Sequence, residues 1–84
     1  MAALDYTIIG SKEGTKYKSL ILQVNDATAA DTVTVAQLTD ITLMYCVRLD
    51  THAAQTNTEA TNVITIGSGP LSTDLHIYVY GYKS

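Results

Sequence analysis

The chain has 84 residues, of which 46% are hydrophobic and 15% charged, with a formal net charge of −3 and one cysteine. This length predicts a single domain over residues 1–84, the lone cysteine excludes an internal disulfide, and five basic residues against eight acidic ones argue against a nucleic-acid partner. No apolar run approaches the roughly 18 residues of a membrane-spanning helix, so we expect a soluble protein of a reducing cytoplasm without a membrane partner.

Apolar and polar residues alternate at every second position along much of the chain, which is typical of β-strands. In chain order, the predicted strands cover residues 4–9, 17–24, 32–37, 41–49, 61–66 and 74–82. GSKEG, residues 10–14, predicts a hairpin loop between the first two strands, because glycine accepts the positive φ of tight turns. Six short strands separated by turn residues predict an all-β fold, a small antiparallel β-sandwich or barrel of about six strands.

Two connecting segments fit more than one local structure. VAQLTDI, residues 35–41, fits either a strand end or a short helical turn before the fourth strand. DTHAAQTNTEA, residues 50–60, fits either an exposed loop or a single helical turn. Neither alternative changes the predicted fold class, because one helical turn is too short to form a layer of its own.

The fourth predicted strand, ITLMYCVRL, carries apolar residues on both of its sides. One side comprises Ile41, Leu43, Tyr45, Val47 and Leu49, and the other comprises Thr42, Met44, Cys46 and Arg48. We expect the first side to face the core. Because Met44 and Cys46 leave the second side only half polar, another layer or another molecule is needed to cover it.

The last predicted strand, within TDLHIYVYGYKS, is also apolar on both sides. His76, Tyr78, Tyr80 and Tyr82 point one way, while Leu75, Ile77, Val79 and Gly81 point the other. Tyrosines on alternate residues, roughly 7 Å apart, can bury on the order of several hundred Å². We therefore predict a tyrosine-rich interface between copies of the chain, formed by His76, Tyr78, Tyr80, Tyr82 and Met44. The alternative is that the tyrosine side forms the core.

Residues capable of catalysis or metal binding do not form a recognisable motif. Asp50 with His52 and Asp74 with His76 are spaced as ligand pairs, but a closed zinc site needs about four converging ligands. Cys46 lies in an apolar strand, where a thiol is typically an inert buried group. We therefore expect no enzyme, no catalytic, cofactor-binding or metal-binding residues, and no cofactor. A small hydrolase or metal site around the two histidines is a further alternative.

Three stretches in the C-terminal part of the chain, from about Asp31 onward, carry a family resemblance: ADTVTVAQL, TNVITIG and HIYVYGY. This part resembles small uncharacterised β-rich proteins from the structural gene modules of tailed bacteriophages and marine viral metagenomes. The resemblance implies a virion-associated protein present in many copies, such as a head-decoration or head-tail component. It also implies other virion proteins as partners and a location in the virion or in the host cytoplasm during assembly. It transfers no site residues.

The sequence thus predicts a non-enzymatic structural or assembly protein that acts as a homo-oligomer. The second hypothesis is a carbohydrate-binding β module that uses Tyr78, Tyr80 and Tyr82 as a stacking platform, since aromatic stripes on strands can stack on flat rings. The two hypotheses place the same side chains against different partners.

Overall fold

The computed structural model describes residues 2–84, which form eight strands and no helix. The strands are β1 (Thr7–Glu13), β2 (Tyr17–Ala27), β3 (Thr32–Thr34), β4 (Leu38–Arg48), β5 (Ala54–Gln55), β6 (Thr58–Ala60), β7 (Val63–Thr65) and β8 (Thr73–Lys83). All strand pairs are antiparallel. The all-β, antiparallel prediction is therefore confirmed.

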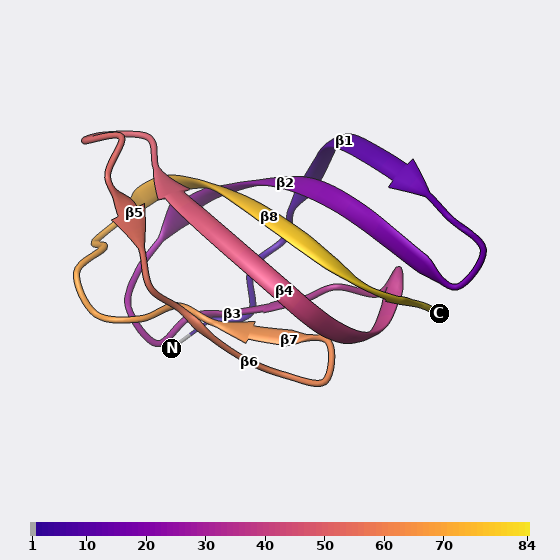
Figure 1. The fold of residues 1–84 in the computed structure, drawn as a ribbon. Helices are drawn as coiled ribbons and strands as arrows, with labels where there is room; N and C mark the ends of the chain where they lie inside the picture. The colour runs from indigo at the N-terminus through magenta and orange to yellow at the C-terminus, as the bar shows by residue number, and fades with distance from the viewer. Residues whose placement is uncertain (1) are drawn as a thin grey trace.

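The strands form two sheets rather than one closed barrel (Figure 1). A five-stranded sheet has the order β1-β2-β8-β4-β5, and a three-stranded sheet has the order β3-β7-β6. The long strands β2, β8 and β4 run side by side through the middle of the larger sheet, and the small sheet lies along one side of it. The architecture is an open, sandwich-like pair of unequal layers.

Each of the six predicted strands overlaps an observed one, although the first, predicted at residues 4–9, shares only residues 7–9 with β1, and two further short strands raise the number to eight. The additional strands, β5 and β6, lie in residues 50–60, where an exposed loop or a helical turn was expected. Two-residue and three-residue strands leave little alternation in sequence, so periodicity does not reveal them. The prediction that GSKEG forms the hairpin loop is wrong, since β1 continues to Glu13 and the hairpin between β1 and β2 turns at residues 14–16.

The hydrophobic core lies between the two sheets. β2 and β8 supply alternate residues that are fully buried, and the small sheet with its flanking residues supplies the opposing layer. The fully buried aliphatic residues of these elements are Leu20, Leu22, Val24, Val33, Val35, Ile64, Leu75, Ile77 and Val79. Burial of each large aliphatic side chain contributes about 1.5–3 kcal/mol to folding, so this double layer is the main source of stability.

A β-bulge in β4 reverses the side to which its residues point. Ile41 pairs with Gly81 and Leu43 pairs with Tyr80, so Thr42 is an extra residue between consecutive partners on β8. Ile41 is 4% exposed and faces the core, whereas Leu43 and Tyr45 are 66% and 60% exposed. The expectation that Leu43 and Tyr45 share the core side with Ile41 is wrong, because one inserted residue shifts a two-residue alternation to the other face.

The remaining residues of β4 follow the reversed pattern. Cys46 pairs with Ile77 and is buried in the core, although it was assigned to the opposite side from Ile41. Val47 pairs with His76 and so shares the side of Leu43 and Tyr45. After the bulge, the residues expected to be outward therefore point inward, and those expected inward point outward.

Gly81 allows the bulge, because β8 passes unusually close to β4 there. A Cβ atom on Gly81 would lie 2.1 Å from the carbonyl oxygen of Asp40 and 3.0 Å from the Cα of Ile41. These neighbours are backbone atoms, which cannot rotate away as a flexible side chain can. Only a residue without a side chain permits this approach, which is a known role of glycine beside bulges.

The N-terminal segment closes the edge of the small sheet beside β3. Both carboxylate oxygens of the buried Asp31 accept backbone hydrogen bonds, from the N–H of Ala2 at 2.8 Å and from that of Thr28 at 3.0 Å. The N–H of Leu4 donates to the carbonyl oxygen of Thr32 at 2.8 Å. Leu4 and Tyr6 also pack against the core. The segment before β1 is therefore part of the folded unit.

Candidate interaction face

The side of the five-stranded sheet that points away from the three-stranded sheet is here called the outer face. Strand register assigns to it alternate residues of the three long strands, in cross-strand pairs centred on β8. Its residues are Tyr17, Ser19, Ile21 and Gln23 on β2, His76, Tyr78, Tyr80 and Tyr82 on β8, and Leu43, Tyr45 and Val47 on β4. Among residues 2–84, no strand or loop forms a second layer over this face.

The two sides of β8 have opposite environments. Leu75, Ile77 and Val79 are completely buried, whereas Tyr78 and Tyr80 on the other side remain 51% and 37% exposed. The alternative that the tyrosine side forms the core is therefore wrong. The physical reason is that the small sheet covers the aliphatic side of β8 and leaves the tyrosine side open to solvent.

At one end of the outer face, three tyrosines pack on one another. The ring of Tyr17 is stacked on that of Tyr80, with centroids 5.2 Å apart and planes 6° apart, and it lies 4.7 Å from the ring of Tyr82. The Tyr17 hydroxyl donates to the Tyr82 hydroxyl at 3.1 Å. This hydrogen bond with Tyr82 raises the pKa of the Tyr17 phenol above its usual value. The three rings thus form a preorganised surface, here called the tyrosine cluster.

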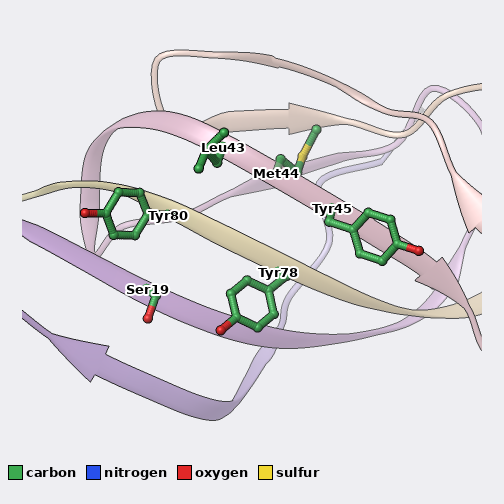
Figure 2. Close-up of a pocket in the computed structure, with 6 residues that line it drawn as sticks. All are labelled: Ser19, Leu43, Met44, Tyr45, Tyr78 and Tyr80. Atoms are coloured by element: carbon green, nitrogen blue, oxygen red, sulfur yellow. The ribbon is translucent and has the colours of Figure 1, made fainter.

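The middle of the outer face is hollowed between β4, β8 and β2 (Figure 2). The hollow has a volume of about 530 Å³ and is open to solvent along the sheet. Its lining consists of Ser19, Leu43, Met44, Tyr45, Tyr78 and Tyr80. The pairs Leu43 with Tyr80 and Tyr45 with Tyr78 stand directly across from each other on β4 and β8. The hollow is therefore bounded mainly by apolar and aromatic surface, and its polar side-chain groups are the hydroxyls of Ser19 and the tyrosines.

Formal charges lie around the outer face and not in its middle. Lys12 is opposite Ser19 on the edge strand β1, and Asp40 is opposite Tyr82 near the far end of β4. At the corner beyond the tyrosine cluster, Glu13 forms ion pairs with Lys18 at 3.1 Å and Lys83 at 3.4 Å. Hydrogen bonds from Lys18 and then Lys83 lower the pKa of the exposed Glu13 carboxyl. No Asp, Glu, Lys or Arg side chain of residues 2–84 lies in the centre of the face.

Of the predicted interface residues, His76, Tyr78, Tyr80 and Tyr82 all lie together on the outer face, on β8. Met44 differs: it pairs with Val79 on the core side of the sheet, is half-buried against the core, and reaches only the lining of the hollow. That these residues form an interface stays a prediction. The bulge at Thr42 places Met44 on the inner side of β4 and its neighbours Leu43 and Tyr45 on the outer side.

Sequence reasoning missed three large side chains of the outer face, namely Tyr17, Leu43 and Tyr45. A signal for Tyr17 existed, since it alternates with Leu20 and Leu22 in YKSLILQV and so falls on the side opposite the core. No comparable signal existed for Leu43 and Tyr45, because their placement depends on a bulge that strict alternation does not reveal.

The histidines considered as metal ligands occupy separate settings. The His76 ring nitrogen Nε2 lies 2.5 Å from Oε1 of Gln23, its neighbour across β2 and β8. His52 lies in the turn between β4 and β5, with φ of 60°. Within the described residues, no three or more His, Cys, Asp or Glu side chains are grouped as a metal site would require. The metal hypothesis therefore has no geometric support.

The single thiol has the environment of a structural cysteine. Cys46 is 2% exposed, and burial raises the pKa of its thiol. A nucleophilic cysteine needs the opposite environment, accessible and with a lowered pKa. Its position therefore gives no support to a hydrolase built on Cys46 and His52. None of residues 2–84 belongs to a helix of membrane-spanning length.

Comparisons with protein-family models, with curated proteins and with solved structures find no match to this chain.

Proposed function

We propose that this protein is a non-enzymatic structural or assembly protein that forms a homo-oligomer through its outer face. The observation that supports this proposal is a contiguous exposed surface of large apolar and aromatic side chains over β4 and β8. Its most exposed members are Leu43, Tyr45, Tyr78, Tyr80 and Tyr82. A small domain gains stability when a second copy covers such a surface.

The exposed apolar surface is about as large as a monomer usually leaves open. Taking about 150–250 Å² for each large side chain, the exposed parts of these five residues amount to roughly 500 Å². That is near the upper end of the patches, about 300–600 Å², that monomers leave open. A stable interface takes about 800 Å² from each partner, so a second copy must also cover the polar rim around these five side chains.

The composition of the outer face agrees with this role. Interface centres are enriched in tyrosine and depleted of charge, with polar groups at the rim, and the outer face has that arrangement. The rings of the tyrosine cluster are already ordered by stacking. Little side-chain entropy is therefore lost when a partner covers them.

The resemblance of ADTVTVAQL, TNVITIG and HIYVYGY to phage structural-module proteins supports a more specific role. We propose a virion-associated component, of the head-decoration or head-tail kind, with other virion proteins as further partners. Such components are repeated in many copies, and a self-associating face suits repeated use. The proposed location is the virion, or the host cytoplasm during assembly.

Sedimentation velocity over a micromolar concentration series tests the self-association. The wild-type protein should sediment as an oligomer, while Tyr80→Ser should dissociate at concentrations where far-ultraviolet circular dichroism still shows a folded chain. Leu71→Ser is the matched control, because Leu71 is 78% exposed but lies outside the outer face, in the segment before β8. A wild-type protein that stays monomeric throughout the series would refute the proposal.

The hollow supports a carbohydrate-binding module as the second candidate. Tyr78 and Tyr80 stand on alternate positions of β8, roughly 7 Å apart, and the Ser19 hydroxyl lies between them and β1 as a hydrogen-bonding group. A glycan array combined with quenching of tyrosine fluorescence tests this candidate. A selective saccharide whose binding is lost in Tyr78→Ala would favour it over self-association, and the absence of any selective saccharide would exclude it.

A further inference from the structure

The outer face has a filled part and an unfilled part. In the tyrosine cluster, Tyr17 occupies the space beside Tyr80 and Tyr82, so the chain packs that end with its own side chains. The hollow beside it is not filled by the chain's own residues. On its β4 border, Leu43 and Tyr45 are 66% and 60% exposed, more than any other large apolar residue of the outer face. Leu43 and Tyr45 line the hollow from β4 (Figure 2) and, as the most exposed of its side chains, are here called the ridge.

A ridge beside a hollow on one surface is self-complementary. In a closed dimer both subunits use the same patch. Residue i of the first copy contacts residue j of the second, and residue j of the first copy contacts residue i of the second. A half rotation about an axis parallel to the sheet would place the ridge of each copy opposite the partner's hollow. The side chains that bind most strongly in interfaces are those that fill a pocket near the centre.

The chemistry of the hollow favours a second copy over a small polar ligand. Sites for small polar molecules place several convergent polar groups on an apolar wall. Among the described residues, the lining of the hollow offers hydroxyls, those of Ser19 and of three tyrosines, but it contains no carboxylate, amide or basic side chain. The middle of the outer face carries no formal charge, so a second copy placed against it brings no like charges together.

We propose that two copies pack outer face to outer face about a twofold axis above the seam between β4 and β8, with the Leu43 and Tyr45 ridge of each copy in the hollow of the other. This inference rests on the proposed self-association and adds the position of the axis and the contacts. The axis lies there because the Leu43–Tyr80 and Tyr45–Tyr78 pairs occupy the centre of the uncharged area. Leu43 therefore lies near its own counterpart in the dimer.

A pair of opposite-charge variants tests the position of the axis. In Leu43→Lys and in Leu43→Asp, each homodimer places two like charges close together, which should raise the dissociation constant about tenfold or more. An equimolar mixture of the two variants pairs Lys with Asp across the axis. Native mass spectrometry of the mixture should therefore show heterodimers in excess of either homodimer.

Controls separate this effect from unfolding and from general charge effects. Because Leu43 is exposed, both variants should keep the circular dichroism and unfolding temperature of the wild-type monomer. The matched pair Leu71→Lys and Leu71→Asp changes an exposed leucine off the outer face and should leave dimerisation unchanged, alone or mixed. The same two substitutions at Tyr45 repeat the test at the other residue of the ridge.

The outcomes distinguish this inference from the proposal on which it rests. If the single variants dissociate but no mixture at position 43 or 45 restores a dimer, the outer face is an interface and the proposed axis is wrong. If the variants remain fully dimeric, the copies meet elsewhere, and both the axis and the outer-face interface are wrong. If the wild-type protein is itself monomeric, self-association fails and the inference fails with it.

Discussion

The two faces of the five-stranded sheet come from the same strands and are both rich in large apolar side chains, yet they have different environments. On β8, Ile77 is completely buried between the sheets, while its neighbour Tyr78 is 51% exposed on the outer face. The difference arises from the three-stranded sheet, which is large enough to cover only one side. In a domain of this size, the number of layers determines which apolar face becomes the core.

The largest effect on stability is expected when a buried side chain on the covered face is truncated. Ile77→Ala should lower the free energy of unfolding by about 2–5 kcal/mol, because it leaves a cavity in a fully packed core. Tyr78→Ala, one residue along, should lower it by less than about 1 kcal/mol in the monomer, since the side chain is half exposed. Urea unfolding at low protein concentration measures both. Equal losses would show that the outer face contributes to the core.

A second prediction concerns the residue that permits the bulge between the two faces. Gly81→Ala should destabilise the fold by about 1–3 kcal/mol, because its Cβ would be 2.1 Å from the Asp40 carbonyl oxygen. Gly10→Ala is the control, since its Cβ would meet only the movable Cδ1 of Ile21, at 3.1 Å. Thermal unfolding compares the two. A neutral Gly81→Ala would mean that β4 can pair with β8 without the bulge.

A third prediction uses pH to probe the covered face at Cys46. Burial raises the pKa of this thiol, so its contribution to stability is complete below the ordinary thiol pKa and is lost as the pH rises through the raised value. Cys46→Ala should cost about 1 kcal/mol at neutral pH. The stability difference between the wild-type protein and this variant should shrink in alkaline buffer. A difference that is constant with pH would contradict a buried, neutral thiol.

The smallest effect is expected on the outer face, at the tyrosine cluster. The hydrogen bond between Tyr17 and Tyr82 raises the pKa of Tyr17, so its phenolate should form at higher pH than that of a free tyrosine. Tyr82→Phe should return this ionisation toward its usual range without a measurable change in unfolding temperature. Ultraviolet titration of phenolate absorbance, with Tyr17→Phe to identify the signal, measures it. An unchanged titration would mean that the two hydroxyls are not bonded in solution.

The strands that were predicted best are those with uninterrupted alternation. β2 and β8 keep one register along most of their contact, and both were located within three residues of their observed ends. β4 was located almost as well, but its faces were reversed beyond Thr42. The short strands β5 and β6 carry too few residues for a periodic signal, and they are formed through pairing with β4 and β7. The reversal in β4 was decided by its pairing with β8, which is distant in sequence, and the short strands were decided by hairpin-like pairing with the nearby β4 and β7.

For the candidate site, alternation placed His76, Tyr78, Tyr80 and Tyr82 on one side of a strand, and the structure has them there. It did not indicate that Tyr17 stacks on Tyr80, since the two are far apart in the chain and meet only through the pairing of β2 with β8. It placed Met44 with the tyrosines, whereas the bulge turns that side chain toward the core. The hollow depends on residues of three strands and has no counterpart in any one segment.

The sequence by itself determined that this chain is all-β and that its last strand has an aliphatic side and a tyrosine side, because alternate residues of an extended chain must point to opposite faces. Only the tertiary structure decided which of those sides is buried, because that depends on where the small sheet packs. It also decided which residues of β4 lie beside the tyrosines. A one-residue bulge opposite Gly81 moves the following residues to the other face of the sheet, while the apolar and polar residues on either side of the bulge still alternate.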